Sequence, residues 1–239
     1  MLRFTLFGFP VLIHWMFWLN TALMGGALGA SSPEQLRGLL AWMVAVFLSI
    51  LIHELGHAFT MRNCGDHRVG IVLYAFGGLA QGSRPLTRRE DLMVSAGGPV
   101  VQILVGLAVG WSMTLWKVPF LWLRWMLDAF TTVSLFWALL NLVPIIPLDG
   151  GHLCRAYLGT GRQRQALQIS LVCAGALALV ALQRDLWLAL QDGVLRTLGI
   201  HAVTRVGGGL FALIVFGMLA WNNWKALRHE PQIPWMNAR

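Results

Sequence analysis

Charged residues are scarce in this chain. Only 12% of its 239 residues are Asp, Glu, Lys or Arg, and its mean hydropathy is +0.65. A soluble domain carries roughly 25% charged residues, so the composition argues against a soluble protein and predicts one built for lipid. Once the apolar segments are set aside, too few residues remain for a second folded domain. We therefore expect a single domain over residues 1–239.

Cysteine is scarce as well, which excludes a disulfide scaffold. The three cysteines form neither a paired framework nor a Cys-x-x-Cys motif, and we expect them to be reduced. The net charge of +8 comes from 18 Lys and Arg against 10 Asp and Glu. Because the basic residues do not cluster on a soluble module, this excess indicates membrane loops and not nucleic-acid binding.

Long stretches without charge locate the membrane spans. A spanning helix needs about 20 mostly apolar residues. We predict an all-α membrane protein, a polytopic bundle of about six helices near residues 11–30, 38–61, 92–116, 121–146, 166–190 and 204–226. The first stretch is longer than the apolar part of a signal peptide and lacks a clean cleavage site, so we expect an uncleaved span.

The loop charges predict the orientation of these spans. With six helices, 12 of the 18 Lys and Arg residues fall on the face that holds both termini. The excess of positive charge in cytoplasmic loops then places both termini in the cytoplasm. A chance asymmetry is the alternative interpretation.

The apolar segment 69–80 is too short to span a membrane. Its sequence, VGIVLYAFGGLA, is rich in β-branched and aromatic residues and contains Gly77-Gly78, which favours two strands joined by a tight turn. Open strand edges are not tolerated in lipid. We therefore predict a short re-entrant β-hairpin that packs on protein, with a loop resting on the headgroups as the alternative.

An H-E-x-x-H motif lies near the end of the second predicted span. His53 and His57 are four residues apart, so on a helix both imidazoles face one side and can reach one zinc ion. Glu54 can act as a general base toward water. Three titratable side chains in an apolar span are costly and need partners. Histidines bonded to backbone carbonyls would not explain the carboxylate between them.

A catalytic zinc site needs a third protein ligand, and Asp149 is our candidate. Pro144 and Pro147 break the fourth predicted span just before it, and Gly150-Gly151 permit a sharp turn. The second and fourth spans both run toward the cytoplasm, so their ends are expected at similar depth on that side. His152 is a weaker candidate for ligation, and we expect it to support a ligand. Cys64 and Cys154 rank lower because thiolates favour closed structural sites.

These motifs, in this order, resemble those of the site-2 proteases, a family of intramembrane zinc metalloproteases. The resemblance is carried by the H-E-x-x-H motif and by Asn141-x-x-Pro-x-x-Pro-Leu-Asp149-Gly-Gly. Phe76-Gly77-Gly78 is similar to the family's hairpin, and Ala96-Gly97-Gly98-Pro99 to its third-span element. The compact form is similar to the sporulation-factor-processing branch, and we expect no PDZ or CBS domain within residues 1–239.

The resemblance implies roles for individual residues. It makes His53, His57 and Asp149 the ligands of one Zn2+ and Glu54 the catalytic base. It gives Asn141 a role in positioning substrate or stabilising the oxyanion, although a lone Asn in a span also serves to join helices. Gln102 stands where the family often has Asn, and its role is open.

The hairpin is the expected substrate-binding element, through Tyr74, Phe76, Gly77 and Gly78, because an extended substrate could pair with its edge. The expected partners are transmembrane protein or peptide substrates and membrane lipid, in a prokaryotic inner membrane. Oligomeric state is open.

Two other functions use the same residues. A zinc transporter would need further ligands at successive depths, and a silent membrane protein that only holds client helices would not need Glu54.

Overall fold

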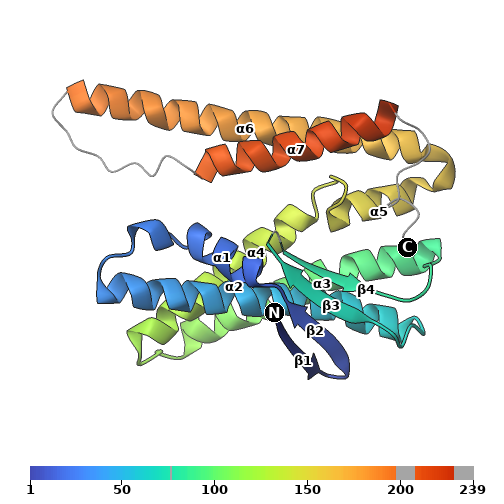
Figure 1. Cartoon of the computed structure of the whole chain (residues 1–239), viewed down its shortest axis with the longest axis horizontal. Coiled ribbons are helices and arrows are strands. Elements are labelled where there is room, and N and C mark those ends of the chain that lie inside the picture. Colours follow the sequence, from blue (N-terminus) through green and yellow to red (C-terminus); the bar gives the residue numbers. More distant parts are fainter. Residues whose placement is uncertain (76, 198–207, 229–239) are drawn as a thin grey trace. The chain divides into compact units, whose positions relative to one another are not determined.

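The computed structural model describes residues 1–75, 77–197 and 208–228. The backbone divides into two compact units, residues 1–142 and the residues from 143 onward. Unit 1 carries a sheet and the helices α1 to α4, and unit 2 carries α5 to α7 (Figure 1).

Unit 1 begins with a four-stranded sheet in the order β1-β2-β3-β4. β1 (Leu2–Leu6) and β2 (Phe9–Ile13) are antiparallel, β2 is parallel to β3 (Gly70–Tyr74), and β3 is antiparallel to β4 (Gly77–Gln81). Phe7 and Gly8 both have positive φ, 52° and 87°, as a two-residue type I′ turn requires. β1 and β4 are the two edge strands.

The helices of unit 1 follow and interleave with these strands. They are α1 (Trp15–Met24), a 3-10 turn (Ala27–Gly29), α2 (Pro33–Asn63), α3 (Arg88–Leu115) and α4 (Leu121–Asn141). Ser32 caps α2 and Thr87 caps α3, each with a capping box that satisfies free N–H groups at the helix start. At 31 residues, α2 is about 46 Å long, more than the hydrocarbon core requires.

The core of unit 1 lies between the sheet and α2. Phe9, Val11 and Ile13 alternate on one face of β2 and are 2–3% exposed. They pack in one cluster with Ile71 of β3 and Leu55 of α2. The sheet is thus held against the helix that carries the H-E-x-x-H motif.

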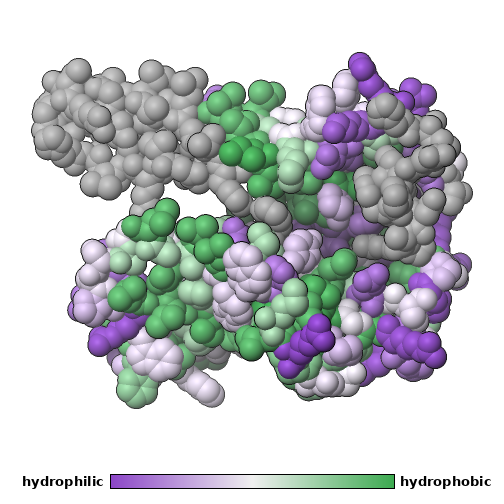
Figure 2. Space-filling view, viewed as in Figure 1, coloured by the Kyte–Doolittle hydropathy of each residue, from purple (hydrophilic) through white to green (hydrophobic). Residues whose placement is uncertain are grey.

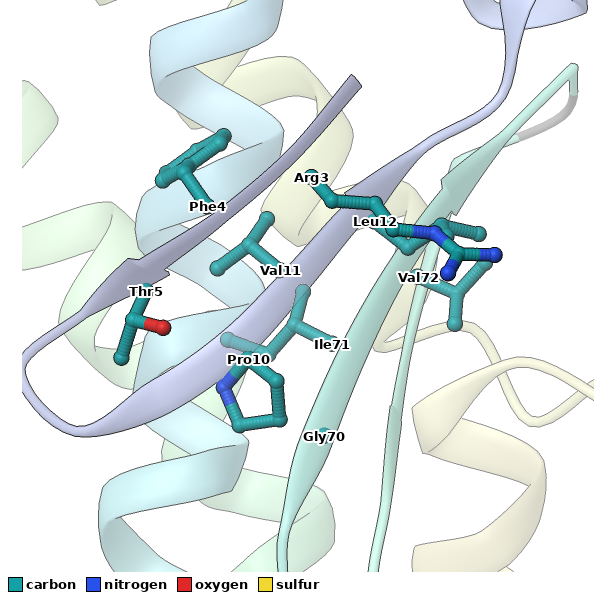
Figure 3. A pocket seen from close by; sticks show the side chains of 9 residues that line it. All are labelled: Arg3, Phe4, Thr5, Pro10, Val11, Leu12, Gly70, Ile71 and Val72. Atoms are coloured by element: carbon teal, nitrogen blue, oxygen red, sulfur yellow. The ribbon is translucent and has the colours of Figure 1, made fainter. Parts of the chain in front are cut away.

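A surface hollow of about 500 Å³ lies along β1, β2 and β3 (Figure 3). Arg3 and Phe4 of β1, Pro10 of β2 and Val72 of β3 are among its lining residues. None of the residues that line it belongs to the predicted active site. The hollow is therefore a feature of the sheet surface, and no predicted catalytic or metal-binding residue lines it.

Unit 2 consists of α5 (Asp149–Leu158), a 3-10 turn (Thr160–Arg162), α6 (Gln163–Thr197) and α7 (Gly208–Arg228). The connection into α5 is anchored from two helices. Ser170 Oγ accepts a hydrogen bond from Ile146 N at 2.8 Å, and Asn223 Nδ2 donates one to Ile146 O at 2.9 Å. The segment before Asp149 is therefore held firmly although it is not helical.

Four helices in the described part of the chain are long and apolar enough to cross a membrane. They are Pro33–Asn63, Arg88–Leu115, Leu121–Asn141 and the Gln163–Gln183 part of α6. Large apolar side chains such as Leu104, Trp111 and Phe136 are more than 60% exposed. Figure 2 shows such hydrophobic side chains on the surface of unit 1. This surface is suited to lipid, as the composition predicted.

The predicted first span, 11–30, is wrong as a single helix. Residues 11–13 belong to β2, and α1 has only 10 residues, too few to span a bilayer. A short apolar run fits a buried strand as well as a helix, and its pairing with β1 and β3 decides for a strand. The fourth span is also shorter than predicted, because α4 ends at Asn141. The sixth prediction, 204–226, lies partly outside the described residues.

Candidate active site

The H-E-x-x-H motif lies in the last third of α2 and is buried. His53 and Glu54 are each 4% exposed and His57 is 7% exposed. The two imidazole rings are nearly perpendicular, with centroids 4.7 Å apart, and their Nε2 atoms lie 3.0 Å from each other. The helical spacing thus brings both rings to one point, as predicted.

The far nitrogen of each ring has a fixed partner. His57 Nδ1 lies 2.7 Å from the backbone oxygen of Val94, which can only accept, so Nδ1 carries the proton. His53 Nδ1 lies 2.9 Å from Gln102 Oε1. In their neutral forms the two rings therefore turn Nε2 lone pairs toward each other.

This arrangement fits a bound zinc ion. Two lone pairs 3.0 Å apart repel, whereas a cation between them would bond to both. With Zn–N bonds of about 2.0–2.1 Å and tetrahedral angles, the two nitrogens of a zinc site lie roughly 3.3 Å apart. The observed separation is close to this value, and the ring tautomers are those that ligation through Nε2 requires.

Glu54 lies under the edge strand β4. A methyl group added to Gly78 would lie 2.3 Å from Glu54 Cγ and 2.5 Å from its Cδ and Oε1. Ordinary carbon contacts are about 3.5–4.0 Å. Only glycine at this position lets the strand pass over the carboxylate, so Gly78 brings the proposed base to the sheet edge.

A similar close approach holds His57 against α3. A methyl group on Gly98 would lie 2.3 Å from His57 Nε2, and one on Gly56 would lie 2.5 Å from the oxygen of Gly97. Small residues allow two helix backbones to approach closely inside a membrane. The Gly97-Gly98 pair thus sets how near α3 comes to the histidine face of α2.

Asp66 anchors the loop after β4 to the end of α2. Its carboxylate accepts hydrogen bonds from the hydroxyl and backbone N of Ser83 and from the backbone N of Arg68 and Arg84. Burial raises the pKa of this carboxyl, but these four donors outweigh it and the net pKa is lowered from 3.8. Arg84 also donates to the Cys64 oxygen and pairs with Glu90.

Asp149 is the first residue of α5, in unit 2. The helix break predicted from Pro144 and Pro147 is confirmed, because α4 ends at Asn141 and α5 starts at Asp149. A methyl group on Gly151 would lie 2.5 Å from Ile145 C, so the tight turn requires glycine there. Asp149 is half-buried, and the neighbouring His152 is 6% exposed.

The remaining predicted residues lie on the hairpin and on α4. Tyr74 ends β3 and is 42% exposed, whereas Gly77 starts β4 with φ of 141°. Phe76 lies outside the described residues. Asn141 is the last residue of α4 and is half-buried. Its role and the substrate-binding role of the hairpin stay predictions.

Sequence reasoning missed the polar support of the histidines. Ser49 and Ser134 are fully buried and join Gln102 in one hydrogen-bonded chain. Serines in apolar spans are common, so only the contacts identify them. The glycines that face Glu54 and His57 are Gly78 and Gly98. The only sequence signal for them was weak, namely that each belongs to a Gly-Gly pair.

Comparison with known proteins shows similarity in sequence and in fold. The family model of peptidase family M50 matches residues 118–182, which include Asn141 and Asp149. The chain is 31% identical to Rip3 of Mycobacterium tuberculosis, named as a candidate zinc metalloprotease, over 93% of this chain and 56% of that protein. It is 33% identical to stage IV sporulation protein FB of Bacillus subtilis over 49% of this chain and 40% of that protein. The chain therefore spans about half the length of the curated relatives it matches.

The fold also has a solved counterpart. The structure is similar to that of a site-2 protease from Methanocaldococcus jannaschii, with a TM-score of 0.59, 19% identity and 97% of both chains covered.

Proposed function

We propose that the chain is an intramembrane zinc metalloprotease of peptidase family M50, the site-2 protease family, because the family model matches residues 118–182 and Rip3 is 31% identical over 93% of this chain. Its substrates would be membrane proteins, cleaved in or near their transmembrane segments. The observation that carries the proposal is the pair of Nε2 atoms 3.0 Å apart, together with the neighbouring residue Glu54 under the edge strand β4. Four candidate spans support a multi-pass membrane protein.

His53, His57 and Asp149 would hold the zinc ion. Two imidazoles and a carboxylate are a donor set that can hold a metal ion, and three protein ligands leave a position for water or substrate. When bound, zinc is a Lewis acid that polarises a carbonyl and makes water more acidic. Asp149 follows a helix break that frees its side chain from the α4 axis.

Glu54 would act as the general base and acid. Its carboxylate would take a proton from the attacking water and return it to the nitrogen of the leaving amine. Burial at 4% exposure keeps bulk water from competing for this proton transfer. Asn141 would position the substrate carbonyl near this centre.

The substrate would bind as an added strand on β4. A helical substrate hides its carbonyls in its own hydrogen bonds, so it must unwind before cleavage. β4 is an edge strand, and an extended segment paired with it would run next to Glu54, which lies beneath Gly78. Proline at a substrate position that donates to β4 should slow cleavage, and proline well outside the paired segment should not.

The orientation and remaining spans belong to the same proposal. Both termini would be cytoplasmic, and α7 together with the N-terminal region would complete about six membrane passages. Arg62 follows His57 by roughly 7–8 Å of helix rise, which would place the metal in the cytoplasmic half of the bilayer.

The decisive experiment compares Glu54→Gln with Glu34→Gln, an exposed residue in the first turn of the same helix. Purified Glu54→Gln should keep stoichiometric zinc and lose cleavage of a reporter membrane substrate, while Glu34→Gln should keep both. Retained cleavage in Glu54→Gln would refute the enzyme and favour a silent binding protein. Zinc uptake into vesicles by the wild type would favour a transporter, which would need further ligands at successive depths.

A further inference from the structure

We propose that Gln102 is a positioning residue that holds His53 in the tautomer able to bind metal, and that Ser49 fixes the orientation of the Gln102 amide. The four side chains form one buried chain of hydrogen bonds across α2, α3 and α4. This inference rests on the metal site of the proposed function.

The orientation of the Gln102 amide follows from its partners. Its nitrogen lies 3.3 Å from the backbone oxygen of Ser49 and 2.9 Å from Ser49 Oγ. A backbone oxygen can only accept, so the NH2 end of the amide must face Ser49. The oxygen end, Oε1, therefore faces His53.

The tautomer of His53 follows in turn. Gln102 Oε1 has no proton, so the hydrogen bond of 2.9 Å to His53 requires the proton on Nδ1. In the neutral ring this leaves a lone pair on Nε2, the atom that faces His57. With the amide reversed, its NH2 group would instead favour a lone pair on Nδ1 and a proton on Nε2, which blocks ligation.

The backbone oxygen of Ser49 keeps the amide from reversing, because it can only accept, whereas a serine hydroxyl can donate as well as accept. Ser49 Oγ accepts from Gln102, so its own proton is free to bond Ser134 Oγ at 2.9 Å. Gln102, Ser49 and Ser134 are each 0% exposed, so water cannot replace a lost partner. A buried donor that loses its acceptor is costly. The series of hydrogen bonds thus has one favourable donor-to-acceptor direction, and this direction puts the proton of His53 on Nδ1.

The two histidines are held by different means. His57 bonds the backbone oxygen of Val94, whose acceptor character no substitution changes. His53 depends on a side chain. The tautomer of His53 is therefore sensitive to mutation in α3, whereas that of His57 serves as an internal reference.

The test measures the tautomer and zinc binding separately. Metal-free protein labelled with 15N-histidine is compared as wild type and as Gln102→Leu, with the His53 signal assigned by its loss in His53→Asn. Wild type should show a protonated Nδ1 and an unprotonated Nε2 at His53, and Gln102→Leu should show mixed tautomers. Zinc affinity, measured by chelator competition, should fall about 10–100-fold in Gln102→Leu, as expected for loss of a partner behind a ligand.

Three further variants separate positioning from packing. Gln102→Glu retains an acceptor for His53 and should restore both the tautomer and most of the zinc affinity. Ser49→Ala removes the hydroxyl partner of the amide but keeps the backbone oxygen that sets its direction, so the His53 tautomer should stay as in wild type. Val100→Ala changes an exposed residue of α3 and should change neither.

The outcomes are distinct. An unchanged His53 tautomer in Gln102→Leu would overturn the proposal, and so would zinc loss in Gln102→Leu without a tautomer change. A proton on Nε2 of His53 in the wild type would overturn it as well, and that measurement does not depend on whether Gln102→Leu folds. If wild-type protein binds no zinc, the proposed function fails, while the tautomer measurement on metal-free protein still tests the role of Gln102.

Discussion

Replacing Gly78 by alanine should separate catalysis from folding and from zinc binding. Gly78 lies in β4 directly over Glu54, and the added methyl group would lie 2.3 Å from Glu54 Cγ. Ordinary carbon contacts are about 3.5–4.0 Å, so the Glu54 side chain must move by roughly 1–1.5 Å. Either the carboxylate or the strand gives way, and both changes displace the base from the substrate edge.

The expected sizes of the two effects differ. Misplacing a catalytic group by about 1 Å can reduce the rate by about 100-fold, which corresponds to about 2.7 kcal/mol. Overpacking a buried site costs about 1–3 kcal/mol of stability. We expect the lower part of that range because Glu54 Cγ belongs to a flexible side chain. Zinc should be retained, because the nearest atoms to the methyl group belong to Glu54 and to neither histidine.

The assay follows cleavage of a reporter membrane substrate, zinc content and thermal unfolding in the same preparation. Gly70→Ala in the adjacent strand β3 is the matched control, since its methyl group would meet nothing closer than 3.8 Å. Gly78→Ala should lose cleavage about 100-fold more than Gly70→Ala at similar zinc content. Equal cleavage by the two variants would refute the placement of Glu54 under β4. Loss of zinc in Gly78→Ala would show that the substitution disturbs the whole site and not the base alone.

Two other substitutions test the surroundings of the site. Gly98→Ala would place a methyl group 2.3 Å from His57 Nε2, so zinc affinity measured by chelator competition should fall at least tenfold, whereas the exposed Val100→Ala should leave it unchanged. Asp66→Asn should lower the unfolding temperature at pH 7, because the carboxylate accepts four hydrogen bonds there. Because the folded pKa of Asp66 is lowered, its contribution is present above the unfolded pKa near 3.8 and disappears as pH falls through the lower folded value. The gap between wild type and Asp66→Asn should therefore narrow from pH 7 to pH 3, and a constant gap would contradict the lowered pKa.

Residue spacing predicted the placement of the histidine pair and the helix break better than it predicted the chain path. The His53–His57 spacing determines that two imidazoles share a helix face, and the structure places their Nε2 atoms together. Pro144 and Pro147 likewise predicted that the helix ends before Asp149. In each case the cause is local, because it depends on helix geometry or on proline within a few residues.

Residues 2–13 show where local reasoning fails. The segment is mostly apolar and suits a strand or a helix. Residues 2–6 pair with residues 9–13, and residues 11–13 also pair with β3, about 60 residues later, so strand pairing decides for a sheet. The hairpin at residues 69–80 was predicted as a strand pair, and Gly70–Tyr74 and Gly77–Gln81 are such a pair. Its place as one half of a four-stranded sheet depended on contacts that no local pattern contains.

The sequence by itself determined the lipid character of the chain, the histidine pair with its carboxylate and the break before Asp149. These follow from composition and from spacings within one helix turn or one proline motif. Tertiary structure alone decided that Gly78 covers Glu54, that Gly98 adjoins His57 and that Gln102 orients His53. Each of those contacts joins residues more than 20 positions apart, and close packing makes them depend on distances of a few tenths of an ångström.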